Sequence, residues 1–313
     1  MSYSFSVQSK TELPLEKIIE GISIENLKHE QFQIGDLQMP ISEACYIEGV
    51  STRAVLFTYE KGIYNVRILI FSSPEDYQVA FTLIKNVARL TNAEIESEEG
   101  LTVSLENFDN HFNIKWIERK EHAYFNTIKV TSREDGGMSQ SDGYKRTFYY
   151  GEKMFKHINK LSNDLSTQYD FFINRMRDIQ NIENKGISVS NIQRFKHIET
   201  GEIEGLVIWD VNEDSFLPYS NYIGIRDEKG KPFKFDYNLL EEFREELKEI
   251  VRLDEKQFVI MKINTGELIY LIEKIKELSN LGESNEDKKK GEDDNNEMKK
   301  KSWFKRIIDT YKP

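Results

Sequence analysis

The sequence predicts an α+β fold in which helices pack on mixed and antiparallel sheets in two subdomains. Strand-like segments come in consecutive runs that are closed by helices, instead of alternating one for one with them. Aromatic residues make up 12% of the chain, which favours a folded core although only 38% of residues are hydrophobic. The length of 313 residues favours two domains, because hydrophobic cores stop growing at roughly 250 to 300 residues.

The first predicted domain is an N-terminal α+β domain over residues 1–150. The first ten residues alternate in polarity and predict a strand, and residues 13–21 predict a short helix. Residues 53–71 predict a hairpin that turns at Lys61 and Gly62, because β-branched and aromatic residues flank the turn. Cys45 lies in a further predicted strand, where a small core residue is the expected role.

A helix is expected to begin directly after this hairpin. Ser73 is a good N-cap, Pro74 suits the first helical position and Asp76 completes a capping box. Apolar residues then recur at helical spacing as far as Leu90. The remainder of the domain predicts a strand over residues 124–132 and a glycine- and serine-rich loop over residues 134–143.

Residues 151–185 predict a connecting helix or a helical pair. The interval between Gly151 and Gly186 contains neither glycine nor proline, and its apolar residues are spaced by threes and fours. One continuous helix could present a coiled-coil seam, whereas a break near residues 162–164 would give two helices packed on a sheet. The tyrosines and phenylalanines on the apolar face favour the packed pair.

The C-terminal α+β domain is predicted over residues 186–281. Two hairpins are expected, over residues 192–211 and 221–237, each around a glycine-containing turn. A helix over residues 238–251 and a strand over residues 257–263 follow. Asn264 and Glu267 then form a capping box for a last helix that ends before Gly282.

The end of the chain predicts a disordered charged linker and a short helix. Residues 282–298 contain no aromatic or branched apolar residue and cannot form a core. Residues 299–313 predict a basic amphipathic helix that could dock on a partner protein, lie on an anionic membrane or fold back on the acidic body. We favour docking, and the expected partner-binding residues are Trp303, Phe304, Ile307, Ile308, Tyr311, Lys299, Lys300 and Lys301.

The composition of the chain and the absence of known motifs argue against several classes of function. The net charge of -11 argues against a nucleic-acid partner, and a single cysteine with no secretory or membrane segment indicates a cytoplasmic protein. No GxG phosphate loop or HExxH zinc motif occurs, so we expect no cofactor and no metal. Asp210, Asn212 and Asp214 resemble the start of a calcium loop, but Ser215 replaces the required glycine and an ordinary turn is favoured.

These observations predict a non-enzymatic, cytosolic protein-binding protein. An acidic body suits a basic partner, as in toxin-neutralising immunity proteins, or an accessory or adaptor role in a larger bacterial assembly. Two alternatives remain open. One is an enzyme whose catalytic residues are scattered acids and tyrosines, and the other is a peripheral membrane protein that uses its C-terminal helix.

Overall fold

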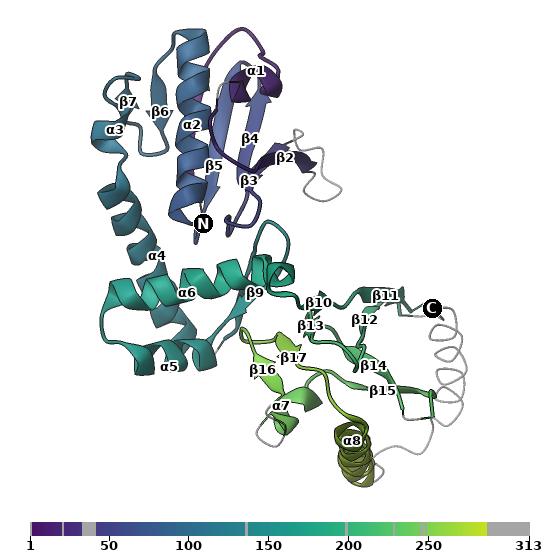
Figure 1. Ribbon diagram of the computed structural model, residues 1–313. Helices are drawn as coiled ribbons and strands as arrows, with labels where there is room; N and C mark the ends of the chain where they lie inside the picture. Colours follow the sequence, from purple (N-terminus) through teal and green to yellow (C-terminus); the bar gives the residue numbers. More distant parts are fainter. Residues whose placement is uncertain are drawn as a thin grey trace. The chain divides into compact units, whose positions relative to one another are not determined.

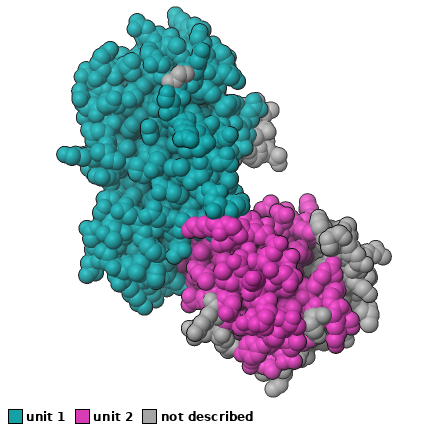
Figure 2. All heavy atoms as spheres, viewed as in Figure 1, with its two compact units in different colours: residues 1–184 teal, residues 185–313 magenta. Residues whose placement is uncertain are grey.

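The computed structural model describes residues 2–20, 22–32, 42–134, 137–197, 200–227, 229–244, 247 and 249–286 (Figure 1). The chain divides into two compact units, residues 1–184 (unit 1) and residues 185–313 (unit 2), which Figure 2 distinguishes by colour. Each unit combines antiparallel or mixed sheets with helices, which confirms the predicted α+β class.

Unit 1 contains a seven-stranded sheet with the order β2-β3-β4-β5-β1-β6-β7, in which all neighbours are antiparallel. The predicted hairpin forms its centre, and the N-terminal strand pairs with the second arm of that hairpin. The strands are β1 (Ser2–Gln8), β2 (Leu27–Phe32), β3 (Ser42–Ile47), β4 (Val55–Glu60), β5 (Ile63–Leu69), β6 (Ile95–Ser97) and β7 (Thr102–Val103).

Helix α2 (Pro74–Thr91) lies along one face of this sheet, as Figure 1 shows. It begins with the predicted capping box, in which the Ser73 hydroxyl accepts from the Asp76 backbone N–H and the Asp76 carboxylate accepts from the Ser73 backbone N–H. Its apolar side shares one core cluster with the inward residues of β1 and β5. The short helices α1 (Leu15–Ile19) and α3 (Phe108–His111) complete this part of the unit.

A second part of unit 1 consists of three helices and a two-stranded hairpin. The helices α4 (Ile114–Glu134), α5 (Glu152–Leu161) and α6 (Leu165–Gln180) contact one another, and β8 (Ser139–Asp142) pairs with β9 (Thr147–Tyr150). Of the two alternatives for residues 151–185, the structure shows the helical pair, α5 and α6. Both helices belong to unit 1, which ends at residue 184. In the interior of this second part of unit 1, aromatic rings of Phe71, Phe125, Tyr150 and Phe172 pack together.

Unit 2 contains two four-stranded sheets, with the orders β10-β13-β17-β16 and β11-β12-β14-β15. The pairs β10–β13 and β12–β14 are parallel and the others antiparallel. Its elements are η1 (Ile182–Lys185, which starts in unit 1), β10 (Ser188–Val189), β11 (Ile192–Lys196), β12 (Ile203–Ile208), β13 (Ser215–Leu217), β14 (Tyr222–Arg226), β15 (Pro232–Asp236), α7 (Leu239–Phe243), β16 (Ile250–Arg252), β17 (Phe258–Ile260) and α8 (Thr265–Glu286).

Two predicted elements of unit 1 are wrong. Residues 124–132, predicted as a strand, belong to α4, because Phe125 packs on Phe155 and Phe172 as part of an amphipathic helix and this packing overrides the local β propensity. Part of the predicted loop 134–143 is strand β8, which the pairing with β9 stabilises.

Two predicted elements of unit 2 also differ. The helix expected over residues 238–251 ends at Phe243, because Ile250 and Val251 pair with Ile260 and Val259 in a sheet. Helix α8 continues to Glu286 instead of ending before Gly282, so the first residues of the expected linker 282–298 are helical. One glycine costs a helix about 1 kcal/mol, which does not end it here.

Candidate functional site

The expected partner-binding residues of the C-terminal tail lie outside the described residues. They are Trp303, Phe304, Ile307, Ile308, Tyr311, Lys299, Lys300 and Lys301. The site that the structure does describe lies in unit 1, where the sheet and α2 meet the second group of helices.

The residues that resembled the start of a calcium loop, and the single cysteine, have structural roles. The Asp210 carboxylate accepts from the backbone N–H of Asn212 at 3.0 Å, and Asp214 accepts from that of Lys262 at 2.8 Å. No described group of three or more His, Cys, Asp or Glu side chains could hold a metal ion. Cys45 is buried in β3, and burial raises the pKa of its thiol to about 12, so the thiol stays protonated.

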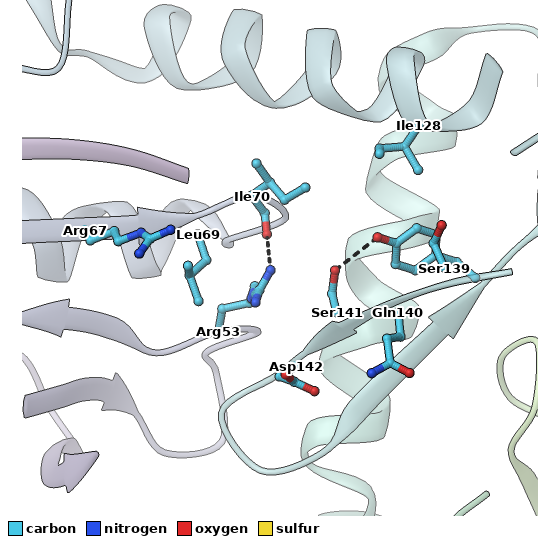
Figure 3. Close-up of a pocket in the computed structure, with 10 residues that line it drawn as sticks. Arg53, Arg67, Leu69, Ile70, Ile128, Ser139, Gln140, Ser141 and Asp142 are labelled. Carbon is cyan, nitrogen blue, oxygen red and sulfur yellow. Dashed lines mark hydrogen bonds between the residues drawn. The ribbon is translucent and has the colours of Figure 1, made fainter. Parts of the chain in front are cut away.

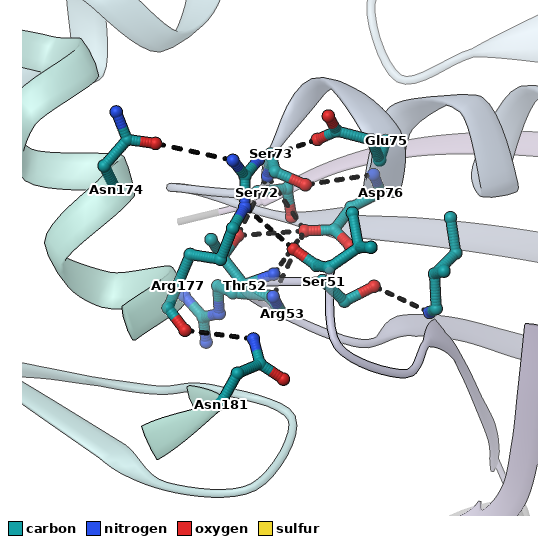
Figure 4. A network of polar contacts seen from close by, with 12 residues as sticks. Ser51, Thr52, Arg53, Ser72, Ser73, Glu75, Asp76, Asn174, Arg177 and Asn181 are labelled. Carbon is teal, nitrogen blue, oxygen red and sulfur yellow. Dashed lines mark hydrogen bonds and ion pairs between the residues drawn. The ribbon is translucent and has the colours of Figure 1, made fainter. Parts of the chain in front are cut away.

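Asp76 organises the two loops at the edge of the site. Its carboxylate oxygen Oδ2 accepts from the backbone N–H of Thr52 at 3.1 Å, of Arg53 at 3.1 Å and of Ser73 at 2.8 Å (Figure 4). Burial raises the pKa of this carboxyl group, and hydrogen bonds from its neighbours oppose that rise. The aspartate of the α2 capping box therefore also fixes the loop that carries Arg53.

Phe71 is held in an unusual backbone conformation between these loops. Its φ of 64° lies in the left-handed region, which costs a residue with a Cβ roughly 1–2 kcal/mol. Its carbonyl lies 2.9 Å from the Thr52 hydroxyl, and its N–H donates to Glu121 Oε2 at 2.9 Å. Its ring packs on Tyr150 and Phe172. These contacts on both backbone groups and on the ring hold the strained conformation.

Glu121 is a fully buried acid on α4. Its Oε1 accepts from the Tyr77 hydroxyl at 2.6 Å, while Oε2 accepts from the Phe71 N–H. Burial raises the pKa of this carboxyl group to about 7, although the hydrogen bonds of Tyr77, Phe71 and Tyr169 and the charge of Arg53 act in the opposite direction. Glu121 therefore changes protonation near neutral pH.

Arg53 is a buried cation with an incomplete set of partners. Only 8% of the residue is exposed. Its Nη1 donates to the Ile70 carbonyl at 2.9 Å, and its Nε has no acceptor among the described residues. Burial lowers the pKa of the guanidinium, while Asp142, Tyr150, Glu121 and Asp76 raise it. A buried donor without an acceptor costs about 1–3 kcal/mol, so this arginine is a candidate for ligand contact.

The Arg53 side chain lines a pocket of about 460 Å³, which we call the Arg53 pocket (Figure 3). The end of β5 forms one wall, and α4 and the β8–β9 hairpin form the other. Across the pocket, the Ser141 and Tyr150 hydroxyl oxygens lie 3.1 Å apart. The polar or charged lining residues are Arg53, Arg67, Ser139, Gln140, Ser141, Asp142 and Tyr150, and the apolar ones are Leu69, Ile70 and Ile128.

This arrangement suits recognition of an anion. Two arginines and hydroxyl donors surround the pocket, and such groups bind carboxylates and phosphates. Glu121 is not among the lining residues; it contacts the far side of the peptide group that joins Ile70 to Phe71, whose carbonyl contacts Arg53. Arg53 and Glu121 are thus linked through one peptide group.

Sequence reasoning missed both of these residues. Glu121 lies four residues after Ile117 and four before Phe125, so it interrupts the apolar face of α4. If residues 114–134 had been predicted as a helix, the charge of Glu121 on the apolar face of that helix would have identified it as a candidate site residue. Arg53 has no comparable signal, because the segments that bury it are distant in sequence.

A protein-family model described as "Domain of unknown function (DUF4299)" matches residues 2–271 of the chain. The match covers most of both units and ends within α8. No curated protein and no solved structure matches the chain. Within the part of the chain that the structure describes, no helix has the length and apolar character needed to cross a membrane.

Proposed function

The chain belongs to the DUF4299 family, and we propose that it is a non-enzymatic protein-binding protein whose Arg53 pocket receives an acidic group of the partner. The observation that carries this proposal is the buried guanidinium of Arg53, whose Nε has no acceptor among the described residues. A partner carboxylate or phosphate would supply the missing acceptor.

The lining of the pocket favours binding over catalysis. Nucleophilic catalysis by serine needs a base within hydrogen-bonding distance. The Ser141 hydroxyl lies 3.1 Å from the Tyr150 hydroxyl, which is not a base at neutral pH, because burial raises the pKa of Tyr150. Glu121, which does titrate near neutrality, contacts Phe71 and Tyr77 instead of lining the pocket.

A basic partner protein with one acidic anchor fits the charges best. The net charge of -11 attracts basic surfaces over a distance of about one Debye length and repels acidic ones. An acidic group that enters the Arg53 pocket would then fix the orientation of the partner, since local charge pairs set specificity more than affinity. An immunity or adaptor role is consistent with this pattern.

Affinity capture with the full chain tests the proposal. We expect Arg53→Met to lose the proteins that the wild-type chain captures, because it removes the cation but keeps most of the side-chain volume. Arg119→Met is the matched control, since it removes one positive charge at an exposed position outside the pocket lining. Circular dichroism and melting curves establish that both variants are folded. If Arg53→Met captures the same proteins in the same amounts, the pocket is not the partner site.

A second candidate function is an enzyme that uses Glu121. The observation in its favour is a carboxyl group with a pKa near 7 in contact with a tyrosine hydroxyl, which suits general acid–base catalysis. This function would require the Phe71 segment to move, so that Glu121 reaches a substrate. Covalent change of a captured partner, lost in Glu121→Gln, would support it, whereas a partner that stays chemically unchanged supports the binding function.

A further inference from the structure

We infer that the Arg53 pocket is a carboxylate site, which takes the side chain of an aspartate or glutamate of the partner on the free edge of the Arg53 guanidinium. This inference rests on the proposed function and adds the chemical class of the group that enters. It follows from the free donors of Arg53, from the hydroxyl pair across the pocket and from the charges of the lining.

The free edge of Arg53 matches a carboxylate. In the described part of the chain, the side chain makes one hydrogen bond, from Nη1 to the Ile70 carbonyl. This leaves the Nε–H and the Nη2 group, which point in the same direction on a planar guanidinium. Such a pair of donors fits the two oxygens of one carboxylate in a bidentate contact.

The opposite wall supplies a further donor. The Ser141 and Tyr150 hydroxyls share one hydrogen bond of 3.1 Å, in which either oxygen can be the donor. The pair has two hydroxyl protons and uses one in this contact. The other proton remains free to be donated to a ligand oxygen, whichever of the two hydroxyls holds it. A ligand in the pocket can therefore contact both walls.

The charge of the lining favours one negative charge over two. Arg53 and Arg67 contribute two positive charges and Asp142 one negative charge, which leaves a net charge of +1. A carboxylate neutralises this charge. A phosphate group carries about -1.5 to -2 at neutral pH and would leave excess negative charge beside Asp142. Behind the pocket wall, Asp76 and Glu121 also disfavour a second charge, because both acids act on Arg53 electrostatically.

Isothermal titration of the full chain with small probes tests the inference. The first probe, N-acetylglutamic acid 1-amide (the glutamate probe), has a side-chain carboxylate and no main-chain one. N-acetylglycine has a main-chain carboxylate only, and inorganic phosphate has no carboxylate. We expect the glutamate probe to bind saturably and phosphate to bind at least about tenfold more weakly. Arg53→Met should weaken the glutamate probe by about tenfold or more, because it removes both donors of the bidentate contact.

Asp142→Asn keeps the test decisive even if Arg53→Met does not fold. Asp142 is exposed, and an asparagine at this position can still accept the 2.9 Å hydrogen bond from the Thr147 hydroxyl. Removal of this negative charge should strengthen binding of the glutamate probe by about threefold. An unchanged or weaker affinity in Asp142→Asn overturns the inference.

The remaining outcomes separate this inference from the proposed function. Phosphate binding as tight as that of the glutamate probe, or no binding of either carboxylate probe, overturns the carboxylate assignment. Tighter binding of N-acetylglycine overturns the assignment to a side chain. In all three cases, loss of partner capture in Arg53→Met would still uphold the pocket as the partner site. Conversely, a carboxylate site whose removal leaves partner capture intact would refute the proposed function alone.

Discussion

The two units bury acidic side chains in different ways. In unit 2, the buried Asp254 accepts from the backbone N–H groups of Lys256 and Gln257, two and three residues away. In unit 1, Asp76 reaches back 24 residues to Thr52, and Glu121 reaches back 50 residues to Phe71. Asp254 contacts the backbone of its own turn. The acids of unit 1 join separate elements and shape the wall of a pocket.

Backbone strain follows the same division. The non-glycine residues with positive φ in the described chain are Asn26, Lys61, Phe71 and Asn92, and all four belong to unit 1. Asn26 and Asn92 are of the residue type that tolerates this conformation and Lys61 lies in a hairpin turn, but Phe71 is buried and bulky. Long-range hydrogen bonds and unusual backbone geometry therefore coincide at the Arg53 pocket, which is typical of functional sites.

Removal of the two buried aspartates is expected to show the largest difference between the units. Asp76→Ala leaves the buried backbone N–H groups of Thr52 and Arg53 without their acceptor, while the Ser73 N–H keeps the Thr52 hydroxyl oxygen as its acceptor. The loss should lower the free energy of unfolding of unit 1 by roughly 3–5 kcal/mol. Asp254→Ala should cost unit 2 about 1–2 kcal/mol, because one of the two backbone N–H groups that donate to it, that of Lys256, is only part-buried.

Denaturant unfolding followed by single-tryptophan fluorescence measures both effects. Trp116 reports on unit 1 and Trp209 on unit 2 once the other tryptophans are replaced by phenylalanine. If both substitutions lowered the free energy of unfolding by the same amount, the number of residues between donor and acceptor would not affect how much such a hydrogen bond stabilises its unit.

The pH dependence of stability should also separate the units. The pKa of Glu121 rises from its ordinary value of 4.5 to about 7 on folding, so folded unit 1 binds this proton more tightly than the unfolded chain. The stabilisation is fully present below pH 4.5 and is lost as the pH rises to 7, with a total of at most about 3 kcal/mol. Glu121→Gln should remove this part of the pH dependence, which unfolding at pH 5, 6, 7 and 8 will measure.

Glu204 of unit 2 provides the contrasting case. Burial raises the pKa of this carboxyl group, but the hydrogen bond and charge of His197 outweigh that effect and leave the pKa below its ordinary value. The contribution of Glu204 to stability is present above pH 4.5 and is lost as the pH falls below that value.

The role given to Glu121 would be contradicted if, between pH 5 and 7, the stability of unit 1 in the wild-type chain did not decrease relative to that in Glu121→Gln.

The smallest effect is expected at a hairpin turn. Lys61 has a φ of 52° in the turn between β4 and β5, a position at which asparagine is favoured. Lys61→Asn should stabilise unit 1 by about 0.5–1 kcal/mol. Lys229→Asn, in the turn between β14 and β15 of unit 2, is the control, because among the described residues of that turn the positive φ belongs to Gly230. Similar gains at both positions would rule out relief of strain as the cause.

Features set by neighbouring residues could be predicted from the sequence. The capping box of α2 depends on residues three positions apart and the β4–β5 hairpin on residues at most 11 positions apart, and both are confirmed. The α+β class follows from the order of such elements. Helix α4 was missed over residues 124–132, because its stability depends on the packing of Phe125 against two distant helices.

The candidate site could not be predicted for the same physical reason. Asp76 was predicted to complete the capping box of α2, but its hydrogen bonds to Thr52 and Arg53 depend on the alignment of two loops. Burial of Arg53 and Glu121 requires both parts of unit 1 to be assembled. The role expected for Trp303 and Ile307 lies outside the described residues and stays a prediction, which Trp303→Ala with Ile307→Ala would test by partner capture.

The peptide group that joins Ile70 to Phe71 gives this chain an internal spectroscopic reporter. Arg53 contacts its carbonyl and Glu121 contacts its N–H, so a change at either side chain alters the polarisation of one amide. The Phe71 cross-peak in a ¹⁵N–¹H correlation spectrum should therefore shift when a carboxylate occupies the pocket, and again when the pH passes through 7. Two titrations of a single resonance would show whether proton uptake accompanies ligand binding.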